Sequence, residues 1–188
     1  MEYKNYFFYE CSKEDLCKIF NVKKIENTEI HSIIHFLEDR GKSAMQADYN
    51  KDFKKSFSDA GWKKEVQVSK DTHIGMTCDF QKNINGNQVY LEIQFGKTEA
   101  ILKDVCKMQI AYNENSLDLG ILIVPFEPRR MFENRQRSIS GMAYFKMVKT
   151  ILPYLHFRFP IWIIGLNLIK FFFLHSTNSL KIVYFRLI

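Results

Sequence analysis

Several features that mark particular classes of protein are missing from this sequence. The chain has four cysteines, Cys11, Cys17, Cys78 and Cys106. They form no CxxC pair and no zinc-ribbon spacing, so we expect reduced thiols rather than a zinc or disulfide framework. No glycine-rich phosphate loop and no Ser-His-Asp pattern is present. The first residues, MEYKNYFFYE, lack the apolar run of a signal peptide, so we expect a cytoplasmic location.

A hydrophobic run long enough to cross a membrane is also missing. The most apolar stretch, FPIWIIGLNLIKFFFL (159–174), is interrupted by Asn167 and Lys170 and is shorter than the roughly 20 residues that a spanning helix needs. Within it, PIWIIGL is typical of a strand that is buried on both faces. We therefore expect no stable membrane insertion. A peripheral membrane protein that uses a basic, aromatic tail is a third hypothesis for the function.

Acidic residues are missing from the last part of the chain. Residues 135–188 hold 8 Lys or Arg and no acid, and residues 1–134 hold the other 19 basic residues and all 21 acidic ones. The net charge of +6 is therefore the sum of +8 and −2. A surface of this kind can face nucleic acid or an anionic membrane, and it can also be a solvated basic surface without a polyanion partner.

What the sequence does contain is the composition of a globular α/β protein, with 188 residues of which 46% are hydrophobic. Hydrophobic periodicity and turn residues predict the elements. They are helices over 28–41 and 43–59, extended stretches over 64–69 and 74–81, a strand within 86–97, a helix over 98–115 capped by Thr98, a buried strand over 117–126, a helix over 140–155 and a last strand over 161–166. This order predicts a mixed central sheet, partly an antiparallel meander and partly parallel, that is flanked by helices.

The predicted strand in GNQVYLEIQFGK (86–97) carries an acid and an amide two residues apart. Its alternation predicts that the apolar residues face the core and that Tyr90, Glu92 and Gln94 face solvent. The preceding Asn-Gly indicates a hairpin, which would bring Asp79 beside Glu92 and Gln94. Two carboxylates placed in this way could share a divalent cation, which activates water and stabilises charge on a phosphodiester. A solvated strand face is the alternative.

The order Asp79…Glu92-Ile93-Gln94, on a hairpin that is followed by an amphipathic helix and a buried strand, resembles the core of PD-(D/E)xK nucleases. Gln at the last position, where most of that superfamily has Lys, resembles the BglII/BstYI group of type II restriction endonucleases. The stretches LEIQFGK, GMAYFKM and FPIWIIGL add to this likeness. It covers roughly residues 28–166. Cys78 stands where a proline often precedes the first acid.

This resemblance implies a restriction-endonuclease-like core in one domain over residues 1–166. A helical N-terminal part (1–62) would precede a catalytic core (63–166), and an apolar, basic tail (167–188) matches no motif of the group. The implied activity is Mg²⁺-dependent cleavage of double-stranded DNA by a homodimer, at a short palindrome within a restriction-modification system. Sites that contain GATC are the first to test. An inactive DNA-binding relative with the same fold is the second hypothesis.

The resemblance also implies roles for individual residues. Asp79, Glu92 and the main-chain carbonyl of Ile93 would hold Mg²⁺. Gln94 would stand where Lys usually orients the attacking water, although a neutral amide cannot act as a strong base. Glu38, on the first predicted helix, is a candidate for a further acid.

Charge and position suggest a surface for DNA. The polar loop EPRRMFENRQRS and the residues after the catalytic strand would contact bases or phosphates. The candidates are Lys97, Thr98, Arg129, Arg130, Asn134, Arg135 and Arg137. A solvated arginine loop is the alternative.

Two weaker candidates for chemistry are interpreted as structural. His31 and His35 have the i, i+4 spacing of a zinc pair, but no third ligand stands at a suggestive distance. We therefore expect them to be ordinary helix histidines, and we expect Cys106 to be a core residue of the helix over 98–115.

Overall fold

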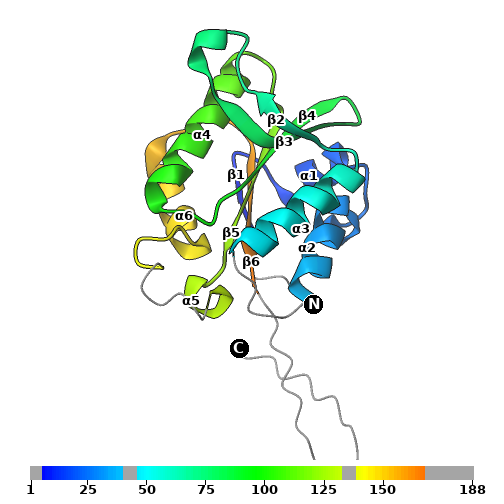
Figure 1. Cartoon of the computed structure of the whole chain (residues 1–188). Helices are drawn as coiled ribbons and strands as arrows, with labels where there is room; N and C mark the ends of the chain where they lie inside the picture. Colours follow the sequence, from blue (N-terminus) through cyan, green and yellow to red (C-terminus); the bar gives the residue numbers. More distant parts are fainter. Residues whose placement is uncertain (1–5, 40–45, 133–138, 168–188) are drawn as a thin grey trace, which may run out of the picture.

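The computed structural model describes residues 6–39, 46–132 and 139–167, which fold into a sheet between two layers of helices (Figure 1). The elements in chain order are β1 (Tyr6–Tyr9), α1 (Lys13–Ile19), η1 (Ile25–Asn27), α2 (Glu29–Asp39), α3 (Gln46–Asp59), β2 (Lys63–Gln67), η2 (Thr72–Ile74), β3 (Thr77–Ile84), β4 (Asn87–Ile93), α4 (Thr98–Asn113), β5 (Leu119–Pro125), α5 (Pro128–Met131), α6 (Phe145–Ile151), η4 (Leu152–Leu155) and β6 (Ile161–Leu166).

The six strands form one mixed sheet in the order β1-β6-β5-β4-β3-β2. Strands β2, β3 and β4 make the predicted antiparallel meander, and β4, β5 and β6 run parallel, connected by helices. The predicted fold class is therefore confirmed. Its parallel part places the carboxyl ends of β4, β5 and β6 at the same edge of the sheet.

Strand β1 was not predicted, so the N-terminal part that we expected to be helical contains a strand as well as α1, α2 and α3. The four residues YFFY pair antiparallel with β6, for example Tyr6 with Ile164. A four-residue strand shows too little alternation to be recognised, and its partner lies far away in the sequence. Its pairing closes one edge of the sheet.

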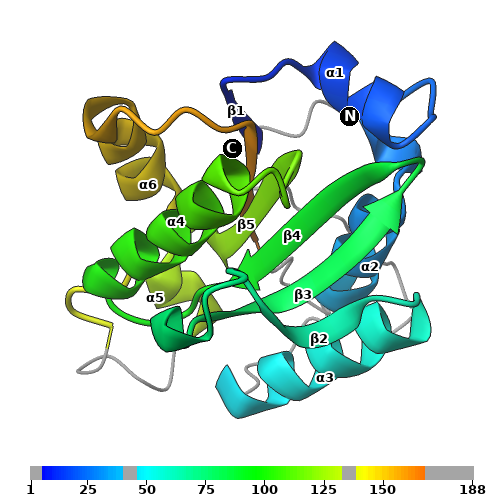
Figure 2. The ribbon, with the colours of Figure 1, turned by 90° about the horizontal axis from the view of Figure 1, so that it is seen from above.

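Helices cover both faces of the sheet (Figure 2). Helices α1, α2 and α3 pack on one face over a core that includes Leu16, Phe53 and Leu91. Helices α4 and α6 pack on the other face over a second core that includes Val105 and Val148. Because both faces are covered, all residues of β5 and β6 are buried, which explains their continuous apolar sequences.

The hairpin between β3 and β4 turns at Asn85 and Gly86, as the Asn-Gly pair predicted. Both residues have positive φ, 51° and 89°, which is the backbone of a two-residue turn that matches strand twist. The turn is tighter than the five residues of NINGN, so β3 extends to Ile84. The hairpin fixes which residues of β3 and β4 lie opposite one another.

Helix α4 begins at Thr98 as predicted, but its predicted cap and the predicted start of α6 at residue 140 are wrong. The Thr98 hydroxyl does not cap α4: it donates to the carbonyl oxygen of Gly141 over 3.1 Å, and Lys97 is the N-cap residue. The Ala143 N–H donates to the Gly96 carbonyl over 2.9 Å. An isolated antiparallel bridge pairs Lys97 with Met142 in the same region, and α6 begins only at Phe145.

Candidate functional site

The hairpin brings together the three residues that the sequence singled out. Asp79 is the third residue of β3, Glu92 is the last but one of β4, and Gln94 follows β4 directly. The last regular pair of the hairpin is Phe80 with Leu91, so Asp79 lies across from Glu92. Asp79 Oδ2 accepts a hydrogen bond of 2.9 Å from the Ile93 N–H.

The face that carries Glu92 is buried, whereas the alternation predicted a solvent-facing side. Tyr90 and Glu92 each expose 2% of their surface. The reason is that α4 packs over this face with Val105 and Met108, which lie in the same core as Tyr90. A charged carboxylate beneath a helix needs compensation from nearby groups.

Helix α4 supplies that compensation through Asp104 and Lys107, which the sequence interpretation missed. Lys107 Nζ lies 2.6 Å from Glu92 Oε1 and 2.9 Å from Asp104 Oδ1. It also donates to the carbonyl oxygen of Thr77 over 3.1 Å. Glu92, Asp104 and Lys107 are all buried, so the pairing is shielded from solvent.

The Gln94 amide is held at both ends. Its Nε2 donates to Asp104 Oδ2 over 2.7 Å, and its Oε1 accepts from the Gly96 N–H over 2.7 Å. The two contacts distinguish the nitrogen from the oxygen, so they fix the orientation of the amide. Asp104 thereby connects Gln94 to Lys107, and Lys107 connects to Glu92.

A signal for the missing pair does exist in the sequence. The apolar face of α4 contains Ile101, Val105 and Met108, and Asp104 lies within this stripe. A charged residue on the buried face of an amphipathic helix is rare unless it is paired. The stripe therefore marks Asp104 as a candidate, but only the fold shows that Lys107 reaches Glu92.

The electrostatics of this group follow from burial and from an excess of acids. Burial raises the pKa of Asp79, although the hydrogen bond from the Ile93 N–H opposes the shift. Burial, with the neighbouring Asp79 and Asp104 carboxylates, raises the pKa of Glu92 to about 8. Burial alone would lower the pKa of Lys107, but Glu92 and Asp104 outweigh it and the pKa is raised. Three acids surround one ammonium, so negative charge is in excess.

The side chains of Asp79 and Glu92 fit a magnesium site that has few protein ligands. Mg²⁺ is usually held by one or two carboxylates, with water and substrate phosphate as further ligands. Asp79 and Glu92 provide two, and Asp104 adds a third acid close to Glu92, because both of these carboxylates pair with Lys107. Within the described residues, no group of three or more His, Cys, Asp or Glu side chains is arranged to hold a metal ion. A site here would therefore depend on its non-protein ligands.

The candidate DNA-contacting residues lie around one edge of the sheet as far as they are described. Lys97 is exposed after β4, and Arg129 is exposed on α5 after β5. Arg130 lies on α5 and Glu38 on α2, and their side chains are not described. Asn134, Arg135, Arg137 and the tail 168–188 lie outside the described residues. Because β4 and β5 are parallel, the segments after them leave the sheet at the same edge.

The remaining candidates have structural surroundings. The His31 ring is buried, and its centroid lies 6.1 Å from that of His35 and 6.4 Å from that of Tyr6. Cys106 is exposed, so the expectation of a core residue is wrong. Its neighbours Val105 and Lys107 face the sheet, which turns Cys106 outward.

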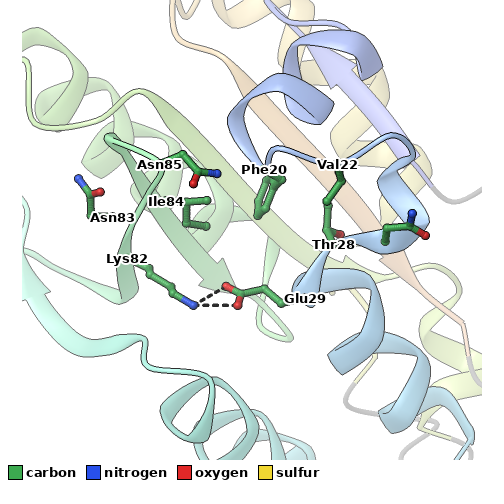
Figure 3. A pocket seen from close by; sticks show the side chains of 9 residues that line it. Phe20, Val22, Thr28, Glu29, Lys82, Asn83, Ile84 and Asn85 are labelled. Atoms are coloured by element: carbon green, nitrogen blue, oxygen red, sulfur yellow. Dashed lines mark hydrogen bonds and ion pairs between the residues drawn. The ribbon is translucent and has the colours of Figure 1, made fainter.

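A pocket of 290 Å³ lies at the hairpin end of β3, and Asp79 is not among its lining residues (Figure 3). Its charged wall is an ion pair in which Lys82 Nζ lies 2.7 Å from Glu29 Oε2. The Trp62 indole N–H also donates to Glu29, over 2.9 Å. These contacts join α2 to the hairpin, so the polar groups of this pocket serve the fold.

A comparison with protein-family models identifies the chain. The model for restriction endonucleases BglII and BglIII matches residues 11–166. The chain belongs to the BglII/BglIII restriction endonuclease family. This finding confirms the resemblance drawn from Asp79, Glu92 and Gln94, and it extends the likeness to α1. The protein is thus a type II restriction endonuclease by family.

The solved structures agree with the family. A crystal structure of restriction endonuclease BglII complexed with a DNA 16-mer matches with a TM-score of 0.62 and 16% sequence identity. The match covers 86% of this chain and 75% of the BglII chain, and at this identity it shows the shared fold. A search of curated proteins found no significant match. Across the described residues, every helix is too short or too polar to span a membrane.

Proposed function

We propose that this member of the BglII/BglIII family cleaves double-stranded DNA at a short palindromic sequence, with Mg²⁺ held by Asp79 and Glu92. The observation that supports it is the pair of acids that the β3–β4 hairpin places across from one another, with Asp79 held by the Ile93 N–H over 2.9 Å and Glu92 buried beside it. The carbonyl of Ile93 completes the proposed ligand set, since it lies between Glu92 and Gln94. Sites containing GATC are the first to test.

The residues of the site would have different roles in cleavage. Bound Mg²⁺ would activate water and stabilise the charge that develops on the phosphodiester. Asp79 and Glu92 would fix the position of the Mg²⁺ ion. The Ile93 N–H holds the Asp79 carboxylate, and Lys107 of α4 pairs with the Glu92 carboxylate. Gln94 presents an amide whose orientation is set by Asp104 and Gly96, and it positions water by hydrogen bonding.

The DNA would lie along the edge where β4, β5 and β6 end. Lys97 and Arg129 are exposed near this edge, and Arg130, Asn134, Arg135 and Arg137 belong to the same connection after β5. Arginine side chains bind phosphates and guanine edges, which suits this position. Thr98 would contribute less, since its hydroxyl already donates to Gly141.

Two further parts of the proposal follow from the palindrome. A two-fold symmetric site is matched by a two-fold symmetric protein, so we propose a homodimer that places one active site on each strand. We also propose a cytoplasmic enzyme of a restriction-modification system. A methyltransferase gene beside the endonuclease gene would support this, because the host must protect its own sites.

The test is cleavage of plasmid DNA by the purified protein with Mg²⁺ and with EDTA. We expect discrete fragments with Mg²⁺, no cleavage with EDTA, and a loss of at least about 10³-fold for Asp79→Ala. Asp59→Ala, at an exposed acid that ends α3, is the matched control and should cleave normally. DNA binding without cleavage under all conditions would instead show an inactive DNA-binding relative.

A further inference from the structure

Lys107 is a buried lysine with three oxygen atoms close to its ammonium group. Nζ forms ion pairs with Glu92 Oε1 at 2.6 Å and with Asp104 Oδ1 at 2.9 Å. It also donates a hydrogen bond to the Thr77 carbonyl oxygen, which accepts it over 3.1 Å. These three contacts hold the side chain in place, and they bring a positive charge to Glu92, one of the proposed catalytic acids.

One of these three contacts differs from the others in kind. Glu92 is a proposed metal ligand, whereas Asp104 and the Thr77 carbonyl are not. A divalent cation that binds Glu92 must share or take the oxygen that now faces Lys107. If Glu92 turns to the metal, the ammonium keeps two of its three acceptors, so it can remain buried without an unpaired charge.

We propose that Lys107 acts as an internal cation that competes with the divalent metal for Glu92 and so sets the metal affinity of the site. The proposal rests on the proposed function, since it requires a metal at Asp79 and Glu92. Lys107 neutralises part of the acid cluster in the absence of metal, which stabilises the fold. The same positive charge repels an incoming divalent cation, which weakens its binding.

A purely structural ion pair makes a different prediction. If Lys107 only secured α4 to the sheet, its removal would lower stability equally with and without metal, and metal affinity would not rise. A competing cation has opposite effects on the two quantities. Its removal lowers the stability of the metal-free protein and raises the affinity for the metal.

The experiment measures Ca²⁺ and Mg²⁺ binding to the purified full chain by calorimetry without DNA, and thermal unfolding in EDTA. For Lys107→Met we expect a dissociation constant lower by about tenfold and a lower unfolding temperature in EDTA, with recovery when Ca²⁺ is added. Lys107→Arg keeps the charge and should bind metal within about twofold of the parent. Lys103→Met, at an exposed lysine on the same helix, is the control and should change neither quantity.

Two results overturn the proposal. One is a Lys107→Met variant that binds metal no more tightly than the Lys103→Met control, and the other is a variant that unfolds in EDTA and does not refold with Ca²⁺. If the parent binds metal and cleaves DNA in either case, the proposed function survives and this inference alone fails. If the parent protein binds no divalent metal, the proposed function and this inference are both wrong.

Discussion

At the scale of single residues, the neutral side chain of Gln94 is held by a hydrogen bond at each end of its amide. Gln94 stands where a charged lysine is usual in related nucleases, and an amide can orient water only if its two ends are distinguished. Asp104 and the Gly96 N–H make that distinction. Gln94 therefore offers a neutral hydrogen-bonding group with a fixed orientation.

The first prediction tests this placement through Gly96. A Cβ atom added there would lie 2.6 Å from Gln94 Oε1, the far end of a flexible side chain that can move away. We expect Gly96→Ala to lower the rate of DNA cleavage by about 10- to 100-fold while the unfolding temperature changes little. Steady-state cleavage and thermal unfolding of the same preparation provide the measurement.

A double-mutant cycle separates this effect from a general one. If Gly96→Ala acts through Gln94, adding it to Gln94→Ala should cost almost nothing more. Fully additive losses would show that Gly96 affects cleavage by another route.

The second prediction concerns Glu92 and pH in the absence of metal. The pKa of Glu92 is raised to about 8, so the folded protein holds a proton that the unfolded chain, with a pKa of 4.5, has lost. The contribution of Glu92 to stability is therefore present below about pH 4.5 and is lost as pH rises towards 8. Glu92→Gln removes this pH dependence. The unfolding free energy of the variant, relative to that of the parent, should therefore increase as pH rises from about 4.5 to about 8.

Urea unfolding in EDTA at pH 5 and pH 8 measures this difference. The unfolding free energy of Glu92→Gln minus that of the parent should be larger at pH 8 than at pH 5. An equal difference at both pH values would mean that Glu92 titrates normally in the folded protein. The exposed Glu99→Gln on α4 is the control and should follow the parent.

At the scale of elements, α4 is the part of the fold that turns a hairpin into a site. Its apolar stripe packs on the sheet, and Lys107 pairs with Glu92 of β4 and donates to the Thr77 carbonyl of β3. Small positional errors of this helix would therefore change the electrostatics of Glu92. The contact between α4 and β5 is close enough to test this dependence.

The third prediction uses Gly120 of β5, which faces Met108 of α4. A Cβ atom there would lie 2.6 Å from Met108 Sδ and 3.1 Å from the Phe159 ring. We expect Gly120→Ala to destabilise the protein by about 1–3 kcal/mol, because Met108 must move in a packed core. Urea unfolding measures the change. In a Met108→Ala background the added cost should shrink, and an undiminished cost would place the strain elsewhere.

How far the elements follow from the sequence depends on whether their signal is local. Periodicity and the Asn-Gly turn predicted the β2-β3-β4 meander, α4, β5 and β6, and these are confirmed. Strand β1 could not be predicted, since four residues have little periodicity and the partner is β6. The burial of Glu92 also could not be predicted with certainty, because alternation describes the two sides of a strand without showing what covers each.

The candidate site was partly predictable for the same reason. The proximity of Asp79 to Glu92 follows from the hairpin alone. The contribution of Lys107 depends on how α4 is docked, which is a long-range property. Tyr90, an aromatic residue on the supposed wet side, was the local hint that this face is covered.

At the scale of the whole molecule, the ends of three parallel strands lie at a single edge, where we propose that DNA binds. Our fourth prediction is that DNA binding weakens steeply with salt, as expected when lysines and arginines displace counterions from phosphates. Lys97→Ala should reduce the slope of log affinity against log salt by about one. Fluorescence anisotropy over a series of salt concentrations gives this slope.

Lys51→Ala provides the matched control for that measurement, since Lys51 is exposed on α3 rather than near this edge. A slope near zero for the parent would leave no phosphate-binding surface. Equal effects of Lys97→Ala and Lys51→Ala would show that the surface extends beyond the proposed edge.

The pairing of β1 with β6 has a consequence for the time at which the nuclease is formed. Tyr6 meets Ile164 across the sheet, although almost the whole described chain separates them. Contacts of such high sequence separation form slowly, because a long loop must close before they stabilise anything. During synthesis, β1 therefore waits for β6, and a ribosome-bound chain cannot complete its sheet until nearly the entire domain has been translated. For an enzyme directed at DNA, this delays the finished fold until β6 has been synthesised and can pair with β1.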